Sequence, residues 1–200
     1  MSSIRPALSL VAPLLALGLS ACVNIGAKSP SILLSLSSAT APAAGSGSSG
    51  LLSEAIVVLE PAADARLGVL RVPVQVNDSS VAYLKGAQWV ERPSRQFQHL
   101  LADGLRARNK GLVIEADQNV AALKIGGRLL AMGYDARSRS ALVRFDAVKF
   151  LPGGKAETRR FENVVPGIAP SGEDVGRALN RAANAVVTEV CDWVSPPPAS

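Results

Sequence analysis

Three long stretches of alternating residues decide the fold, and the first is Val120-Ala-Ala-Leu-Lys-Ile-Gly-Gly-Arg-Leu-Leu-Ala-Met-Gly-Tyr134. In a β-strand, successive side chains point to opposite faces of the sheet. Lys124 and Arg128 fall on one of these faces. The residues predicted to face the core are Ala121, Leu123, Ile125, Leu129 and Ala131. A strand with one polar and one apolar face indicates a sheet that is packed on one side and solvated on the other.

The next two stretches return along the first one. Residues 141–151 alternate in the same way, with Arg144 on the polar face. Their inward positions are predicted to be Val143, Phe145 and Ala147. Polar residues 135–140 separate the first two stretches, and the turn sequence Pro152-Gly-Gly-Lys155 leads into a third strand over residues 156–165. The three stretches are therefore predicted to form an antiparallel meander.

Shorter strands are predicted before the meander. Ala55-Ile-Val-Val-Leu59 is β-branched and ends before Pro61, as a buried strand does. A second strand is expected over residues 67–76, and residues 81–83 are expected to return beside it after a turn.

Two helices complete the prediction. Pro93 suits a first helical turn, and an apolar face follows it at Phe97, Leu100, Leu101 and Leu105. Ser171 can cap a second helix, whose apolar stripe is Val175, Ala178, Leu179, Ala182, Val186, Val190 and Trp193. The expected fold is α+β, a two-layer sandwich with an antiparallel-rich sheet and two helices packed on one face.

The amino-terminal segment has the pattern of a bacterial lipoprotein signal. Arg5 precedes an apolar run, residues 8–19, and the run ends in the lipobox Leu19-Ser-Ala-Cys22. Cleavage before Cys22 would leave a cysteine carrying several acyl chains, such as palmitate. More than one chain makes a stable anchor, at about 0.8 kcal/mol for each buried methylene.

These signals divide the chain. The expected segments are a signal peptide at 1–21, the lipidated Cys22 and a short tether at 22–30, one domain at 31–194 with a flexible Ser/Gly/Ala/Pro loop at 37–53, and a disordered tail at 195–200. Residues 31–36 are either an edge strand or part of the tether, and we favour the strand.

Location and charge limit the partners. Val23 is not the Asp that commonly retains lipoproteins at the inner membrane, so we expect an outer-membrane anchor facing the periplasm of a Gram-negative bacterium. Removal of residues 1–21 takes away one cation, Arg5, and leaves 20 Lys and Arg against 16 Asp and Glu, a net charge of +4. The signs are interspersed rather than gathered in a basic stripe, and we therefore expect no nucleic-acid partner.

We find no enzyme signature in the sequence. His99 is the only histidine, and neither a catalytic triad nor metal-ligand spacing accompanies it. Cys191 is predicted to be a buried, inert thiol, because its near neighbours Glu189 and Asp192 would disfavour a thiolate. Gly126-Gly127 lacks the residues of a phosphate loop and is expected to let a helix approach the sheet. We expect no cofactor beyond the covalent lipid on Cys22, and no metal.

The best candidates for an interaction surface are Lys124, Arg128 and Arg144 on the polar sheet face, together with Trp89. The competing interpretation, which we favour for the three cations, is an ordinary solvated sheet face. For Trp89, it is a side chain that closes one end of the core.

The order of landmarks resembles a known family. After the lipobox come Ile56-Val-Val-Leu-Glu-Pro61, Leu70-Arg-Val-Pro73, Val81-Ala-Tyr83, Gln88-Trp-Val-Glu-Arg-Pro93, Ala178-Leu-Asn-Arg-Ala-Ala183 and Trp193-Val194. Over residues 30–194 this is similar to the ABC-type transport auxiliary lipoproteins, whose paraquat-inducible protein C-like members work with MCE-domain (mammalian cell entry) transporters.

The resemblance implies a periplasmic accessory of a lipid transport system between the inner and outer membranes. Its partners would be an MCE-domain protein, a permease and an ATPase, and the accessory itself would form a closed homo-oligomeric ring. Two other roles stay open: a periplasmic carrier that binds lipid itself, and a structural envelope lipoprotein.

Overall fold

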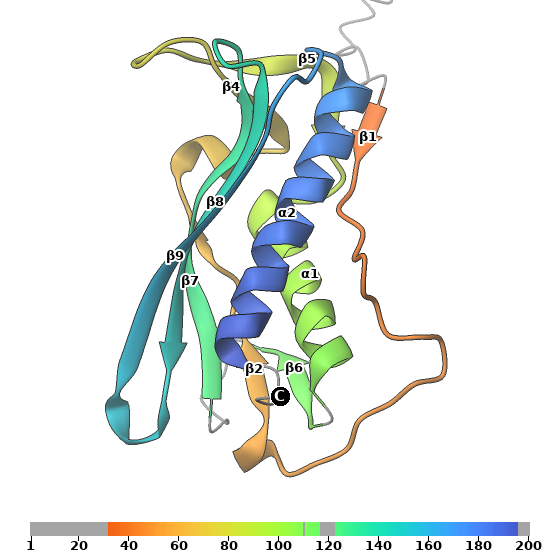
Figure 1. The fold of residues 1–200 in the computed structure, drawn as a ribbon, viewed down its shortest axis with the longest axis vertical. Coiled ribbons are helices and arrows are strands. Elements are labelled where there is room, and N and C mark those ends of the chain that lie inside the picture. Colours follow the sequence, from red (N-terminus) through yellow and green to blue (C-terminus); the bar gives the residue numbers. More distant parts are fainter. Residues whose placement is uncertain (1–31, 110, 117–122, 196–200) are drawn as a thin grey trace, which may run out of the picture.

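The structure, a computed structural model, describes residues 32–109, 111–116 and 123–195. These residues form one nine-stranded sheet and two long helices (Figure 1). The strands are β1 (Ile32–Leu34), β2 (Ile56–Val58), β3 (Ala62–Ala63), β4 (Arg71–Gln75), β5 (Val81–Trp89), β6 (Val113–Glu115), β7 (Leu123–Asp135), β8 (Ser140–Phe150) and β9 (Ala156–Val165). The helices are α1 (Pro93–Arg108) and α2 (Gly172–Val194).

Strand β7 lies at the centre of the sheet. Along one edge it pairs with β8 over its whole length, and β8 pairs with β9, both antiparallel. Along the other edge it meets β2, β3 and β4 in succession, all parallel. β5 pairs antiparallel with β4, while β1 and β6 add parallel partners to β5 and β2. The long ladders are thus antiparallel, and the predicted meander is confirmed.

Both helices pack on the same face of the sheet, as predicted (Figure 1). α2 crosses β8 and β9 and lies beside α1. Its first turn is fixed by Ser171, whose hydroxyl accepts a hydrogen bond from the Asp174 backbone N–H at 3.1 Å. Pro93 occupies the first turn of α1, where a missing N–H costs nothing.

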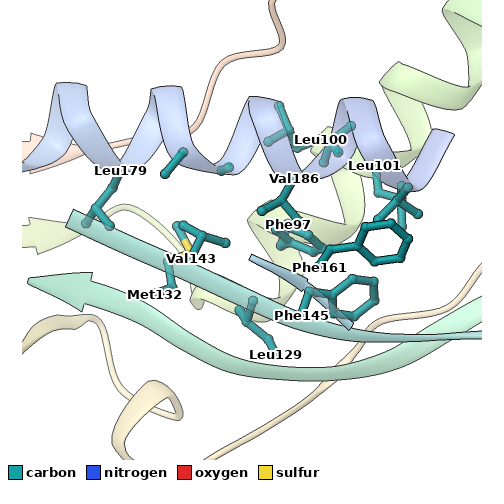
Figure 2. Packing of buried hydrophobic residues seen from close by; sticks show 14 of the residues in the cluster. Phe97, Leu100, Leu101, Leu129, Met132, Val143, Phe145, Phe161, Leu179 and Val186 are labelled. Atoms are coloured by element: carbon teal, nitrogen blue, oxygen red, sulfur yellow. The ribbon is translucent and has the colours of Figure 1, made fainter. Parts of the chain in front are cut away.

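The space between the layers is filled by side chains. Figure 2 shows Phe97 of α1 against Phe145 of β8, and their ring centroids are 4.9 Å apart. Leu179 and Val186 of α2 also pack over the sheet. Each such side chain, when fully buried, contributes about 1.5–3 kcal/mol. The predicted apolar faces of both helices are confirmed, since their residues are buried, apart from the partly buried Trp193.

One predicted inward position in β7 is wrong. The pairing of β7 with β8 shifts between Leu129 and Ala131, so Leu130 is an extra residue, a β-bulge. The bulge reverses the alternation: Ile125 and Leu129 point inward before it, and Met132 and Tyr134 point inward after it. Ala131 instead lies opposite the outward Arg144. Ala121 lies outside the described residues.

The predicted role of Gly126-Gly127 also needs correction. Gly127 has a φ of +137°, and a Cβ there would lie 2.0 Å from the carbonyl oxygen of Asp146. The close neighbour that requires a glycine is therefore the backbone of β8, not a helix. Gly126 faces the side chain of Leu59.

The earlier strands differ from prediction mainly in extent. The expected strand over residues 67–76 is β4 alone, because Ala65–Leu67 form a 3₁₀ turn that buries Leu67. The short strand expected at residues 81–83 continues to Trp89. Ile32–Leu34 form β1 beside β5, which supports the strand interpretation of that segment.

Replacing Gly127 with Ala is expected to destabilise the fold strongly, because the new methyl group would collide with β8 and alanine is strained at this positive φ. We expect the free energy of unfolding, measured by urea denaturation, to fall by about 3 kcal/mol or more. Gly111→Ala is the matched control: a Cβ there meets nothing within 4 Å. Equal stabilities for the two variants would contradict this account.

Candidate interaction surface

The three cations predicted to form a surface lie on β7 and β8, but only two of them are near each other. Arg128 pairs in register with Asp146, two residues from Arg144 on β8. Lys124 pairs in register with Phe150, six residues from Arg144, or about 20 Å along the strand. The structure therefore brings Arg128 and Arg144 together and leaves Lys124 at the far end of the strand.

Carboxylates separate the cations on this face. The guanidinium of Arg128 donates to Asp64 at 2.6 and 3.0 Å, and Arg144 binds Glu162 on β9. Arg160 on β9 binds Asp146 through two hydrogen bonds of 2.6 and 2.7 Å. We call these six residues the outer-face lattice: Asp64, Arg128, Arg144, Asp146, Arg160 and Glu162. With three arginines and three carboxylates, the lattice is neutral in sum.

The lattice changes the electrostatics of the sheet face. Hydrogen bonds from Arg160 lower the pKa of Asp146 below its ordinary value of 3.8, and Asp146 in turn raises the pKa of Arg160. A neutral lattice has no long-range attraction for a polyanion. The sequence indicated the cations but not their partners, because the register between β8 and β9 pairs Arg144 with Glu162 and Asp146 with Arg160.

Trp89 does not belong to this surface. It ends β5 with its side chain in the core, where only 1% of the residue is exposed. This burial fits the interpretation of Trp89 as a residue that closes the core. Its indole N–H has no hydrogen-bond partner among the described residues.

His99 and Cys191, the other two residues considered for chemistry, differ in their exposure to solvent. His99 is an exposed residue of α1 that contacts Glu115 through Nδ1 and lies 3.6 Å from Glu91 through Nε2. Cys191 is fully buried, as predicted, and burial raises the pKa of its thiol to about 11. Among the described residues, no three His, Cys, Asp or Glu side chains are placed to hold a metal ion.

The segment after β1 is bound along the helices by amide side chains, a feature that the sequence analysis missed. We call residues 35–39 the amino-terminal strap. The Leu36 N–H donates to Gln96 at 2.8 Å, the Ser37 N–H to Asn180 at 2.9 Å, and the Ala39 N–H to Asn184 at 2.8 Å. The Asn184 amide also donates to the Ser37 carbonyl at 2.9 Å. Asn180 and Asn184, four residues apart on one helix face, were the available signal.

Cys22 and the expected signal peptide lie outside the described residues. Within the described part, no helix combines the length and the hydropathy needed to span a bilayer.

Comparison with known proteins identifies the family. A family model described as the ABC-type transport auxiliary lipoprotein component matches residues 34–191. The chain belongs to this family. It is therefore an auxiliary lipoprotein component of an ABC-type transport system, and its family description is not that of a catalyst. A lipoprotein family also implies attachment to a membrane.

The solved structures that resemble this chain are distant from it in sequence. A protein from Xanthomonas campestris assigned to the family-model DUF330 has a TM-score of 0.66 and 16% identity, with 81% of this chain and 93% of that chain covered. An uncharacterised protein has a TM-score of 0.64 and 12% identity, covering 82% and 98%. A weaker likeness, with a TM-score of 0.43, 14% identity and coverages of 72% and 91%, is to PelC from Paraburkholderia phytofirmans, a dodecamer. No curated protein matches the chain at a significant level.

In this auxiliary lipoprotein, replacing Arg160 with Ala is expected to raise the pKa of Asp146 towards 3.8, because the hydrogen bonds from Arg160 are the largest cause of its lowering. Carbon-detected NMR titration of the carboxyl group measures the change. The native pair stabilises the fold above the ordinary pKa, and this contribution is lost as the pH falls through the lower folded-state value. Arg159→Ala, which removes a neighbour that lies over Phe161 instead, is the control. An unchanged Asp146 pKa in Arg160→Ala would contradict the lattice.

The strap of the auxiliary lipoprotein offers a second test. Replacing both Asn180 and Asn184 with Ala removes the acceptors of the Ser37 and Ala39 amides. Each such hydrogen bond contributes about 1 kcal/mol net, so both amides should exchange their hydrogens about five-fold faster or more. Arg181→Ala, an exposed position on the same helix, should leave them unchanged. Equal exchange in the two variants would show that the strap is held by other contacts.

Proposed function

We propose that this auxiliary lipoprotein is the periplasmic docking component of an MCE-type ABC transport system that moves phospholipids between the inner and outer membranes. It would be anchored to the outer membrane by lipid on Cys22 and would hold an MCE-domain protein, which works with a permease and an ATPase. Lipid would move through the partner rather than through this domain.

The family match over residues 34–191 carries this proposal, because it identifies an auxiliary rather than a transporting component. The finer assignment to MCE systems is supported by the landmark segments. Ile56-Val-Val58 is β2, Leu70-Arg-Val-Pro73 supplies the first three residues of β4, and Gln88-Trp89 ends β5 just before α1. The outer-membrane location is supported by the lipobox and by Val23 after the cysteine.

The packing of the domain favours docking over carriage of lipid. A carrier needs an apolar cavity of about 300 Å³ or more. Here, the space between the sheet and the helices is occupied by the core. A surface recess of about 470 Å³ does not offer acyl chains an apolar enclosure, because it is lined by Pro42, Ala43, Ser46, Gly47, Ser48, Arg106, Ala107 and Asn109.

The decisive experiment is crosslinking in intact envelopes. Full-length tagged protein is crosslinked, extracted in mild detergent and analysed for its partners by mass spectrometry. We expect an MCE-domain protein, with or without its permease and ATPase. Recovery of only peptidoglycan-linked or unrelated outer-membrane proteins would overturn the proposal and favour a structural role, and co-purified phospholipid in their place would favour the carrier.

Cys22→Ser is the matched variant for the anchor. The native protein should sediment with outer-membrane fractions in a sucrose gradient, whereas Cys22→Ser should lose membrane attachment, because the thioether to lipid cannot form. Sedimentation of the native protein with the inner membrane would contradict the location.

A ring is the oligomer that we propose, since identical subunits favour closed symmetry. Analytical ultracentrifugation of the detergent-extracted protein, with and without its partner, should show a defined oligomer. Monomer alone in both conditions would contradict the ring.

A further inference from the structure

A recess opens where one edge of β7 lacks a neighbouring strand. β3 pairs with β7 as far as Leu129, and β4 begins to pair at Tyr134. The bulge residue Leu130 lies in the gap between them. A pocket of about 240 Å³ is present at this point, and its lining includes Arg66, Leu67, Pro73, Met132, Arg137 and Arg144.

Arg66 places a positive charge in this recess, and both hydrogen-bond acceptors of its side chain among the described residues are neutral groups. Its guanidinium donates to the Gln75 side-chain oxygen at 3.1 Å and to the Leu130 carbonyl at 2.9 Å. The carboxylate of Asp64 lies 3.9 Å from Arg66 and is engaged by Arg128 at 2.6 Å.

The other charged residues at the recess, Asp135, Arg137 and Arg144, already have partners. Asp135 accepts hydrogen bonds from the backbone N–H groups of Arg137 and Ser138 in its own turn. The Arg137 side chain binds Asp78, whose side chain is 93% exposed, and also lies 3.4 Å from the Asp135 carboxylate. Exposed ion pairs contribute little stability, so a ligand can replace Asp78 at Arg137 at small cost.

The rest of the wall is apolar. Leu67 and Met132 are buried, and Pro73 lies beside them. Guanidinium groups bind phosphate oxygens through paired hydrogen bonds, and the volume suits one phosphate with a few carbon atoms. We propose that this recess binds a phosphate ester, with Arg66 as the main contact and Arg137 as a second one.

The ester has two possible sources with the same chemistry: a small soluble molecule, or the headgroup of a phospholipid. The second source rests on the proposed transport function, while the first does not. A direct binding measurement separates this proposal from the crosslinking result, because it needs no partner protein.

Met132 provides the probe. The sequence has two methionines, Met1 and Met132, so selective ¹³C-methyl labelling gives a simple spectrum. Full-length protein in a phosphate-free detergent is titrated with glycerophosphoethanolamine. In a separate sample, the detergent is removed and the protein is reconstituted into vesicles that contain phosphatidylethanolamine. We expect a saturable shift of the Met132 methyl resonance. A shift with the soluble ester alone identifies a small-molecule site, and a shift with vesicles identifies a headgroup site.

Arg66→Gln should weaken binding about ten-fold or more, the effect expected for a lost charge-assisted contact. Because Arg66 also holds the bulge carbonyl, Arg137→Gln tests the charge without touching the bulge and should weaken binding about three-fold. Arg160→Gln, an arginine of the outer-face lattice, should leave binding unchanged.

Three results would overturn the proposal. They are no shift with either phosphate compound, an equal shift with glycerol or ethanolamine alone, and equal weakening by Arg160→Gln and Arg66→Gln.

Discussion

Hydrogen bonding along both edges of β7 is the constraint on which the rest of the structure depends. On one edge, a single long partner, β8, sets the register for β9 and so for the outer-face lattice. On the other edge, the short strands β2, β3 and β4 pair one after another with successive parts of the thirteen-residue β7. The ladder between β7 and β8 is irregular at two points: the backbone of β8 lies close to Gly127, and Leu130 is an extra residue in β7.

The sequence predicted the parts of the fold that a repeating pattern specifies. The alternation of residues 141–151 and the stripe of α2 each correspond to a buried face, and Ser171 caps the helix as its side chain allows. The bulge could not be predicted, because Leu129, Leu130 and Ala131 are all apolar, so no polar residue marks the change of face. The partner of Gly127 depended on the register with β8, which the sequence does not reveal.

The candidate surface was predictable only in part for a similar reason. Arg128 and Arg144 point outward as expected, but the carboxylates that neutralise them come from a distant turn and from β9. Nothing in the sequence marked Arg66 as a candidate binding residue, because its position matters only through the gap between β3 and β4. The charged residues of β9 have a second effect: β9 pairs only with β8 among the described strands, and charges along a free edge discourage pairing with other chains.

The strap determines how a mechanical load would enter the domain. A pull on the chain ahead of Ile32 meets the three-residue strand β1 first, then the amide contacts of residues 35–39. The central ladders of β7 and β8 bear the load only after these have separated. Under tension, the molecule would therefore extend stepwise by local unfolding of β1 and the strap, while its core stays folded.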